Sequence, residues 1–223
     1  MLILLYGLIG IAVGSFLNVV IDRVPERASL VKPPSHCPYC GRTLKTGELI
    51  PIVSYLLLRG RCRTCGASIP VRVPIVEAAG GLLFAFLCWR FGLSLRLLLY
   101  TVFSSILLVI MVIDLEHKLV LNRIVLPAIL LAVLTVPLQR LMAPPLDSHY
   151  AVLWALLGGK ASGLNATQIA MISQLVGGVI AFGIFFIIWL IAPQGMGAGD
   201  VKLAAFAGLV TAFPGALAAV FGS

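Results

Sequence analysis

Six long apolar runs constrain the fold of this chain more than any other feature of its sequence. They cover residues 2–21, 74–89, 97–113, 124–142, 169–192 and 201–221. Each reaches or approaches the length of about 20 residues that a helix needs to cross a bilayer. Charged residues make up only 11% of the chain, whereas soluble domains carry about 25%. Because the runs are continuous and not alternating, we predict an all-α polytopic membrane protein with about six transmembrane helices, and not a barrel.

The basic residues are concentrated in one polar stretch, which predicts how the chain crosses the membrane. Cytoplasmic loops are enriched in Lys and Arg, so we expect this stretch inside the cell and Met1 on the outer side. Counting the spans onward places twelve of the 16 basic residues inside and four outside. We interpret the net charge of +8 as a topology marker that implies no nucleic-acid partner. The nine basic residues of the stretch are Arg23, Arg27, Lys32, Arg42, Lys45, Arg59, Arg61, Arg63 and Arg72.

The polar stretch also contains four of the five cysteines, arranged as two pairs. Cys37-x2-Cys40 and Cys62-x2-Cys65 are separated by 21 residues. Two such pairs supply the four thiolates of a tetrahedral structural zinc site. Disulfides and free redox-active thiols are the alternatives, and the expected cytoplasmic location argues against disulfides. We predict that zinc stabilises this small loop, which cannot form a large core of its own.

These features divide the chain into three predicted parts. Residues 1–21 form a first transmembrane helix, residues 22–73 form a cytoplasmic zinc-binding loop domain, and residues 74–223 form a membrane-embedded domain.

Two of the eight acidic residues stand where apolar runs meet the predicted cytoplasmic side. Asp114 ends the third run, and Asp200 begins the sixth. Three glycines, Gly195, Gly197 and Gly199, directly precede Asp200. Both carboxylates could be ordinary charges at helix ends, with Asp200 as an N-cap, or they could line a cation or proton path. They could also share one proton and activate a water, as in aspartic proteolysis. The residues alone leave all three interpretations open.

Several longer motifs together resemble one family, the bacterial type IV prepilin peptidases, which are membrane aspartic proteases of the Gly-x-Gly-Asp class. The last of these motifs reads Gly-Met-Gly-Ala-Gly-Asp-Val-Lys-Leu. It is moderately specific by itself and highly specific together with the cysteine loop. The similar stretches follow the family order over most of the chain, at residues 14–25, the two cysteine pairs with residues 58–61, and residues 74–77, 113–122 and 195–203.

The resemblance implies a site and an activity. Asp114 and Asp200 match the catalytic aspartates, and the four paired cysteines match the zinc ligands. Such enzymes remove the short basic leader from type IV prepilins or pseudopilins, after a glycine at the cytoplasmic face of the bacterial inner membrane. Most members with the cysteine loop also methylate the new N-terminal amine with S-adenosylmethionine. That second activity rests on the resemblance alone. Glu116, Lys202 and the three glycines before Asp200 are the further candidates for substrate or loop contacts.

Three features depart from the family pattern. Glu116 stands where many relatives carry a second aspartate, which favours Asp114 as the catalytic residue. The 85 residues between Asp114 and Asp200 exceed the expected number, and we place the excess in the outer segment 143–168. The chain stops at Ser223, so we expect either a short member of the family or a C-terminally truncated chain.

The near absence of charge within the apolar runs bears on the alternative functions. A multi-pass transporter with a zinc-stabilised loop would line its path with charged residues, so the sequence argues against it. A non-enzymatic membrane scaffold for pilus assembly is the other alternative. Glu77 is expected either to reach the interface or to take part in methylation. Asn18 is expected either to form a hydrogen bond between helices or to contact substrate.

Overall fold

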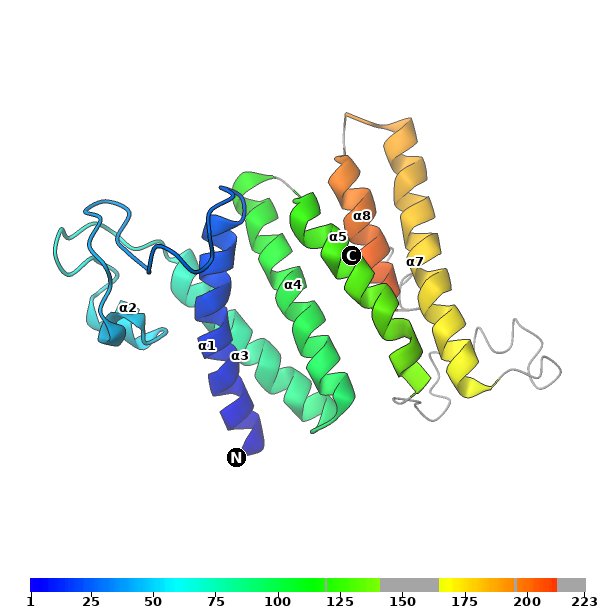
Figure 1. The fold of residues 1–223 in the computed structure, drawn as a ribbon, viewed down its shortest axis with the longest axis horizontal. Coiled ribbons are helices and arrows are strands. Elements are labelled where there is room, and N and C mark those ends of the chain that lie inside the picture. The colour runs from blue at the N-terminus through cyan, green and yellow to red at the C-terminus, as the bar shows by residue number, and fades with distance from the viewer. Residues whose placement is uncertain (119, 141–164, 195, 212–223) are drawn as a thin grey trace. The chain divides into compact units, whose positions relative to one another are not determined.

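The structure, a computed structural model, describes residues 1–118, 120–140, 165–194 and 196–211 (Figure 1). Within those ranges the chain is helical and has no β-strand, only two isolated antiparallel bridges in the loop. It forms two compact units, Met1–Glu116 and His117–Ser223. The predicted all-α class is therefore confirmed for the described residues.

Three long helices and the cysteine loop make up the first unit. The helices are α1 (Leu2–Arg23), α3 (Arg72–Phe91) and α4 (Leu95–His117), whose last residue falls just beyond the unit. They coincide with the first three apolar runs, each lengthened by a few residues at its ends. Between α1 and α3 the loop contains only a 3-10 turn, η1 (Thr46–Leu49), and the short helix α2 (Val53–Leu57).

Glycines bring α1 and α3 into direct backbone contact. A Cβ atom on Gly10 would meet the carbonyl oxygen of Gly80 and would lie 2.7 Å from the Cβ of Phe84. Further along α1, a Cβ atom on Gly14 would lie 2.8 Å from the Cα of Glu77. Small residues allow membrane helices to approach closely. Close van der Waals packing matters there because lipid is as apolar as the helix surface, so the hydrophobic effect does not drive the helices together.

The first half of α4 packs against the other two helices through apolar and hydroxyl groups. Leu97 of α4 is buried together with Leu87 and Cys88 of α3. The hydroxyl oxygens of Tyr6 on α1 and Thr101 on α4 lie 2.8 Å apart. Cys88 is therefore a small buried side chain of the helix core, away from the paired cysteines.

The second unit contains α5 (Asn122–Thr135), which continues as the 3-10 helix η2 (Val136–Arg140), and the helices α7 (Ala166–Ile191) and α8 (Ala198–Thr211). Asn165 and Gln168 form a capping box at the start of α7. Glycines again allow close packing, since a Cβ atom on Gly208 of α8 would meet the carbonyl oxygen of Gly177 on α7.

Four described helices are long and apolar enough to cross a membrane: α1, α3, α4 and Met171–Ile191 of α7. The fourth predicted run is helical as far as it is described, because α5 continues directly into the 3-10 helix η2 as far as Arg140. Helix α8 is described as far as Thr211. The remainder of the sixth run and most of the predicted outer segment lie outside the described residues.

We expect Gly10→Ala to destabilise the protein by about 1–3 kcal/mol, because the new methyl group would overlap the backbone of α3. Gly183→Ala on α7 is the matched control, since no atom lies within 4 Å of a Cβ built there. The control should be neutral or should stabilise by at most about 1 kcal/mol, as alanine favours a helix. Thermal unfolding of the full chain in detergent micelles measures both, and equal midpoints for the two variants would contradict the close packing.

Candidate metal centre and active site

The two cysteine pairs lie in two turns of the same construction. The N–H of Gly41 donates to the carbonyl oxygen of Cys37 at 2.9 Å, and the N–H of Gly66 donates to that of Cys62 at 3.0 Å. Both glycines adopt a left-handed conformation, with φ of 67° and 71°, which glycine accepts without strain. The glycine that follows each pair is thus required by the turn that positions the two thiols.

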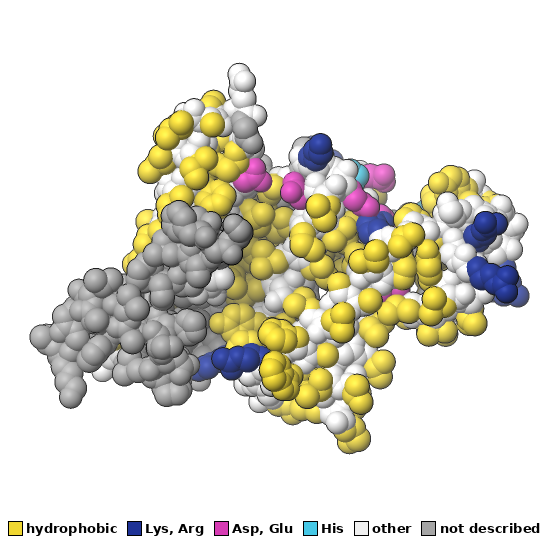
Figure 2. All heavy atoms as spheres, turned by 180° about the vertical axis from the view of Figure 1, so that it is seen from behind, with side chains coloured by type: hydrophobic (Ala, Val, Ile, Leu, Met, Phe, Trp, Pro, Cys, Tyr) yellow, Lys and Arg dark blue, Asp and Glu magenta, His cyan; other side chains and the backbone are white. Residues whose placement is uncertain are grey.

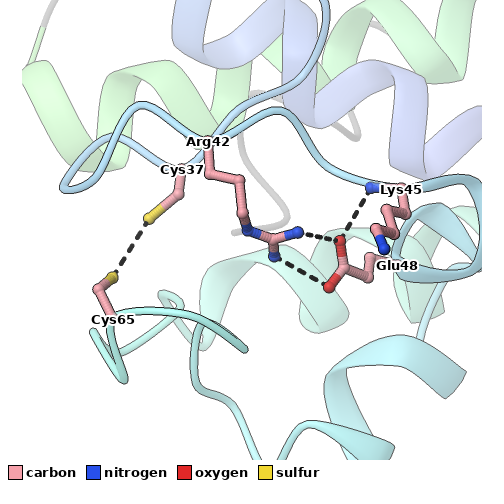
Figure 3. A network of polar contacts seen from close by, with 5 residues as sticks. All are labelled: Cys37, Arg42, Lys45, Glu48 and Cys65. Atoms are coloured by element: carbon pink, nitrogen blue, oxygen red, sulfur yellow. Dashed lines mark hydrogen bonds and ion pairs between the residues drawn. The ribbon is translucent and has the colours of Figure 1, made fainter.

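The four thiol groups form one compact cluster. All four Sγ atoms lie within 4.8 Å of one another, and those of Cys37 and Cys65 are 3.8 Å apart (Figure 3). A tetrahedral zinc ion with Zn–S bonds of about 2.3 Å places its sulfur ligands roughly 3.8 Å apart. The predicted cluster of four cysteines is confirmed, and its dimensions fit a metal ion.

The turns favour the thiolate form at the first cysteine of each pair. Backbone N–H groups of Cys65 and Thr64 lower the pKa of Cys62 to about 6. The N–H of Cys40, together with a second backbone N–H, lowers the pKa of Cys37 in the same way. At Cys65 the nearby backbone N–H also favours the thiolate, but burial and the adjacent sulfurs outweigh it and raise the pKa to about 11. Thiolates are the form that binds a metal. The backbone N–H groups therefore favour the metal-binding form of Cys37 and Cys62.

An ion pair between Arg42 and Glu48 stabilises the segment between the cysteine pairs. Arg42 donates two parallel hydrogen bonds to Glu48, at 3.1 and 2.9 Å, and the N–H of Lys45 donates a third at 2.8 Å (Figure 3). The Arg42 guanidinium lowers the pKa of Glu48 from 4.5 to about 2. Because the folded pKa is depressed, this pair stabilises the loop fully above about pH 4.5 and loses its effect as the pH falls towards 2.

Arg72, the first residue of α3, forms ion pairs with residues near the C-terminal ends of α1 and α4. Its Nη2 donates to Oδ1 of Asp22 at 2.6 Å, and its Nε lies 3.0 Å from Oε1 of Glu116. Asn18 adds a hydrogen bond of 3.1 Å from its Nδ2 to the carbonyl oxygen of Val73, which confirms the expected bond between helices. Glu116, predicted to contact substrate, is thus already paired within its own unit.

We expect Arg72→Gln to lower the stability of the first unit by about 1–3 kcal/mol, since it removes contacts to two carboxylates at once. The control is Asp22→Asn, which should cost less than about 1 kcal/mol because the Asp22 side chain is 59% exposed. Hydrogen exchange along the last turn of α4 should increase in the first variant and stay unchanged in the second. Equal exchange in both variants would show that Arg72 does not hold this end of α4.

Glu77 is buried in α3, with only 4% of its surface exposed, so it does not reach the interface. Its Oε2 accepts a hydrogen bond of 2.6 Å from the N–H of Ile52. Ile52 has a φ of 60°, a conformation that is costly for a β-branched residue. Glu77 therefore anchors the loop segment before α2 onto α3.

Asp200 is the third residue of α8 and not its N-cap, which corrects one of the sequence interpretations. Its Oδ2 accepts a hydrogen bond of 2.9 Å from the N–H of Gly197, the residue before the helix. This is the reciprocal half of a capping box, in which the third residue reaches back to the cap. The contact fixes the half-buried carboxylate at the beginning of α8.

The segment before α5 lies against the glycine stretch. A Cβ atom on Gly199 would lie 2.5 Å from the Cβ of Val120, so the glycine is required by a close approach of the chain itself. Lys202 donates a hydrogen bond of 2.8 Å to the side-chain oxygen of Asn122. Gly197 has only ordinary contacts, and Gly195 lies outside the described residues.

The two aspartates belong to different units. Asp114 lies in the last turn of α4, half-buried, and Asp200 lies at the start of α8. Their pairing therefore stays a prediction. Sequence reasoning missed Arg72, Val120 and Asn122. The signal it could have used is that Val120 and Asn122 belong to a stretch that resembles the family and that Arg72 lies two residues before another.

Comparisons with known proteins place this geometry in a known family. The bacterial peptidase A24 N-terminal domain matches residues 8–91, and the type IV leader peptidase family matches residues 101–223. No solved structure matches the chain significantly.

Several curated relatives carry the name prepilin leader peptidase/N-methyltransferase. The relative from Bacillus subtilis is 38% identical over 90% of this chain and 70% of its own length. The relative from Stutzerimonas stutzeri is 32% identical over the same shares, and that from Myxococcus xanthus is 50% identical over 49% of this chain and 32% of its own length. The family match supports the peptidase interpretation and not the transporter or scaffold. The chain belongs to the type IV leader peptidase family.

Proposed function

We propose that this protein is a membrane aspartic endopeptidase that removes the leader from type IV prepilins or pseudopilins. The observation that carries the proposal is the family match over residues 101–223, which contains both Asp114 and Asp200. The names of the relatives describe the same reaction. Substrates of this kind present a basic leader followed by an apolar segment, which would place the scissile bond at the membrane face.

In the proposed mechanism, Asp114 and Asp200 bracket the water that attacks the peptide bond. One carboxylate is ionised and acts as general base, while the other is protonated and donates to the leaving amine. The two titrate as a coupled pair, so the proton belongs to both.

The metal and the second activity follow from different observations. We assign zinc to the cluster of Cys37, Cys40, Cys62 and Cys65, since four thiolates at these distances fill a tetrahedral shell and leave no open position for catalysis. The ion would be structural. Methyl transfer from S-adenosylmethionine to the new N-terminus is proposed from the names of the relatives. No residue is assigned to that cofactor.

The orientation of the chain is proposed from its charges. Lys and Arg in short loops remain cytoplasmic, which places the cysteine loop and both aspartates inside and Met1 outside the bacterial inner membrane. The leader of a prepilin is basic and cytoplasmic before cleavage, so substrate and site would meet on one side. Within the first unit, Arg72 supplies one positive charge against the two carboxylates of Asp22 and Glu116, so this cluster keeps a net negative charge beside such a leader.

The proposal is tested with the full chain in liposomes and a prepilin segment that carries a basic leader, a glycine at the junction and an apolar helix. We expect mass spectrometry to show the released leader and the shortened segment. With S-adenosylmethionine present, the shortened segment should gain one methyl group at its N-terminus. Zinc-loaded protein that leaves the segment intact would contradict the proposal, and ion flux without cleavage would favour a transporter.

A further inference from the structure

An uncharged run of ten residues, 49–58, lies between the two cysteine pairs of the otherwise basic loop. It includes α2 and leaves most of its large apolar side chains outside the protein core. The most exposed are Leu57 at 78% and Leu56 at 67%. Three further residues are about half exposed: Leu49, Ile50 and Val53. A loop in water would gain nothing from such a surface, and the run is too short to span a bilayer.

The contact with Glu77 indicates the depth at which this run lies. The N–H of Ile52 bonds to Glu77, which follows Arg72 by five residues, or about 7 Å along α3. Arg72, Asp22 and Glu116 mark where the charged ends of three helices meet. Charges are expelled from hydrocarbon, so the polar boundary lies near that cluster. Ile52 is therefore on the membrane side of this boundary, and Figure 1 draws α2 level with α1 and not beyond its Arg23 end.

The residues around this run have the composition expected at a lipid surface, with exposed apolar side chains on α3 and exposed basic side chains after the run. The neighbouring helix α3 also exposes large apolar side chains, with Ile75 at 60% and Leu82 at 74%. Directly after the run come three exposed basic residues, and Figure 2 shows hydrophobic and basic side chains next to one another on the loop domain. Basic side chains next to an apolar helix face are typical of elements that lie in the interface of anionic membranes. The three are Arg59, Arg61 and Arg63.

We propose that residues 49–58 dip into the cytoplasmic leaflet, with the leucines of α2 among the acyl chains and the following arginines at the phosphate groups. The loop domain is then held at two points, to α3 by the hydrogen bond from Ile52 to Glu77 and to the bilayer by the leucines of α2. This proposal does not depend on the catalytic assignment, because it concerns only the first unit.

The experiment uses the full, zinc-loaded chain in nanodiscs that contain anionic lipid, with trifluoromethyl-phenylalanine introduced at Leu57. The matched control carries the same probe at Tyr39, an aromatic residue of the first cysteine turn that is 72% exposed. Fluorine relaxation is measured with dissolved oxygen, which concentrates in lipid, and with a water-soluble nickel chelate. We expect the oxygen effect at Leu57 to exceed the nickel effect several-fold, and the reverse at Tyr39.

Three results would overturn the proposal. In the first, the probe at Leu57 responds to nickel as strongly as the probe at Tyr39, which places it in water. In the second, it is shielded from both reagents, which means that protein, such as a second copy, covers it. In the third, it becomes lipid-like only after a prepilin segment is added, which assigns the surface to substrate. If the Leu57 variant fails to retain zinc, the probe at Leu56 gives the same test with the same expected outcome.

Discussion

Replacing Asp200 with asparagine is expected to lower the rate of prepilin cleavage by at least about 1,000-fold, within the range that a general acid or base contributes. Asparagine has the same shape, and its side-chain oxygen can still accept the hydrogen bond from the N–H of Gly197. The loop before α8 should therefore keep its structure while the titratable group is lost. Asp114→Asn should have an effect of the same size, because the two carboxylates act as one unit.

The assay needs a control that removes a carboxylate without touching the proposed pair. Glu116→Gln serves this purpose, since it lies two residues after Asp114 on α4 and its partner is Arg72. We expect this variant to keep cleavage within about tenfold of the parent, because losing a half-exposed ion pair removes at most about 1 kcal/mol. Substantial cleavage by Asp200→Asn, or an equally severe loss in Glu116→Gln, would overturn the assignment of the catalytic pair.

Removing the metal should unfold the cysteine loop and leave the long helices intact. Structural zinc in small domains contributes of the order of 10 kcal/mol to folding, and the described part of this loop has only two short helical turns of its own. After chelation, or in Cys62→Ser, we expect limited proteolysis to cut between residues 24 and 71. The helical circular dichroism of the protein in micelles should change little.

Cys88→Ser is the control for the metal experiment. Cys88 is buried in α3 and does not belong to the four-sulfur cluster, so this variant should retain one zinc ion per chain and the protease resistance of the loop. Metal analysis of the purified protein measures the stoichiometry directly. Protein that is folded and protease-resistant in the loop without any bound metal would contradict the structural role.

The helices could be predicted from the sequence because each depends on local composition. Apolar runs gave α1, α3, α4 and α7 to within a few residues. The cysteine cluster was also predictable, because the two-residue spacing within each pair is itself the geometric requirement for a shared ion. The fourth run continues from α5 directly into η2, a change of helix type at Val136 that the hydropathy of a run does not register.

The contacts that position the candidate site could not be read from the sequence in the same way. Arg72 meets Asp22 across 50 residues, and Val120 meets Gly199 across 79. Such pairs depend on how helices pack, which no local pattern encodes. The nine basic residues of the loop together indicate topology. That count does not distinguish Arg72, which pairs with Asp22 and Glu116, from the other eight. The run 49–58 was hidden in the same way, inside a stretch that was polar on average.

The ion pair between Asp22 and Arg72 has a consequence for how the protein is assembled. The ion pair joins the residue before the loop to the residue after it, so residues 23–71 form a closed loop between α1 and α3. Closing a free segment of this length costs about 3 kcal/mol of chain entropy. Packing of α1 against α3 already closes the loop. The entropy cost of then bringing the two cysteine pairs together around a metal ion is therefore smaller. We therefore expect biogenesis to proceed in a fixed order, with insertion of the second span before capture of the metal.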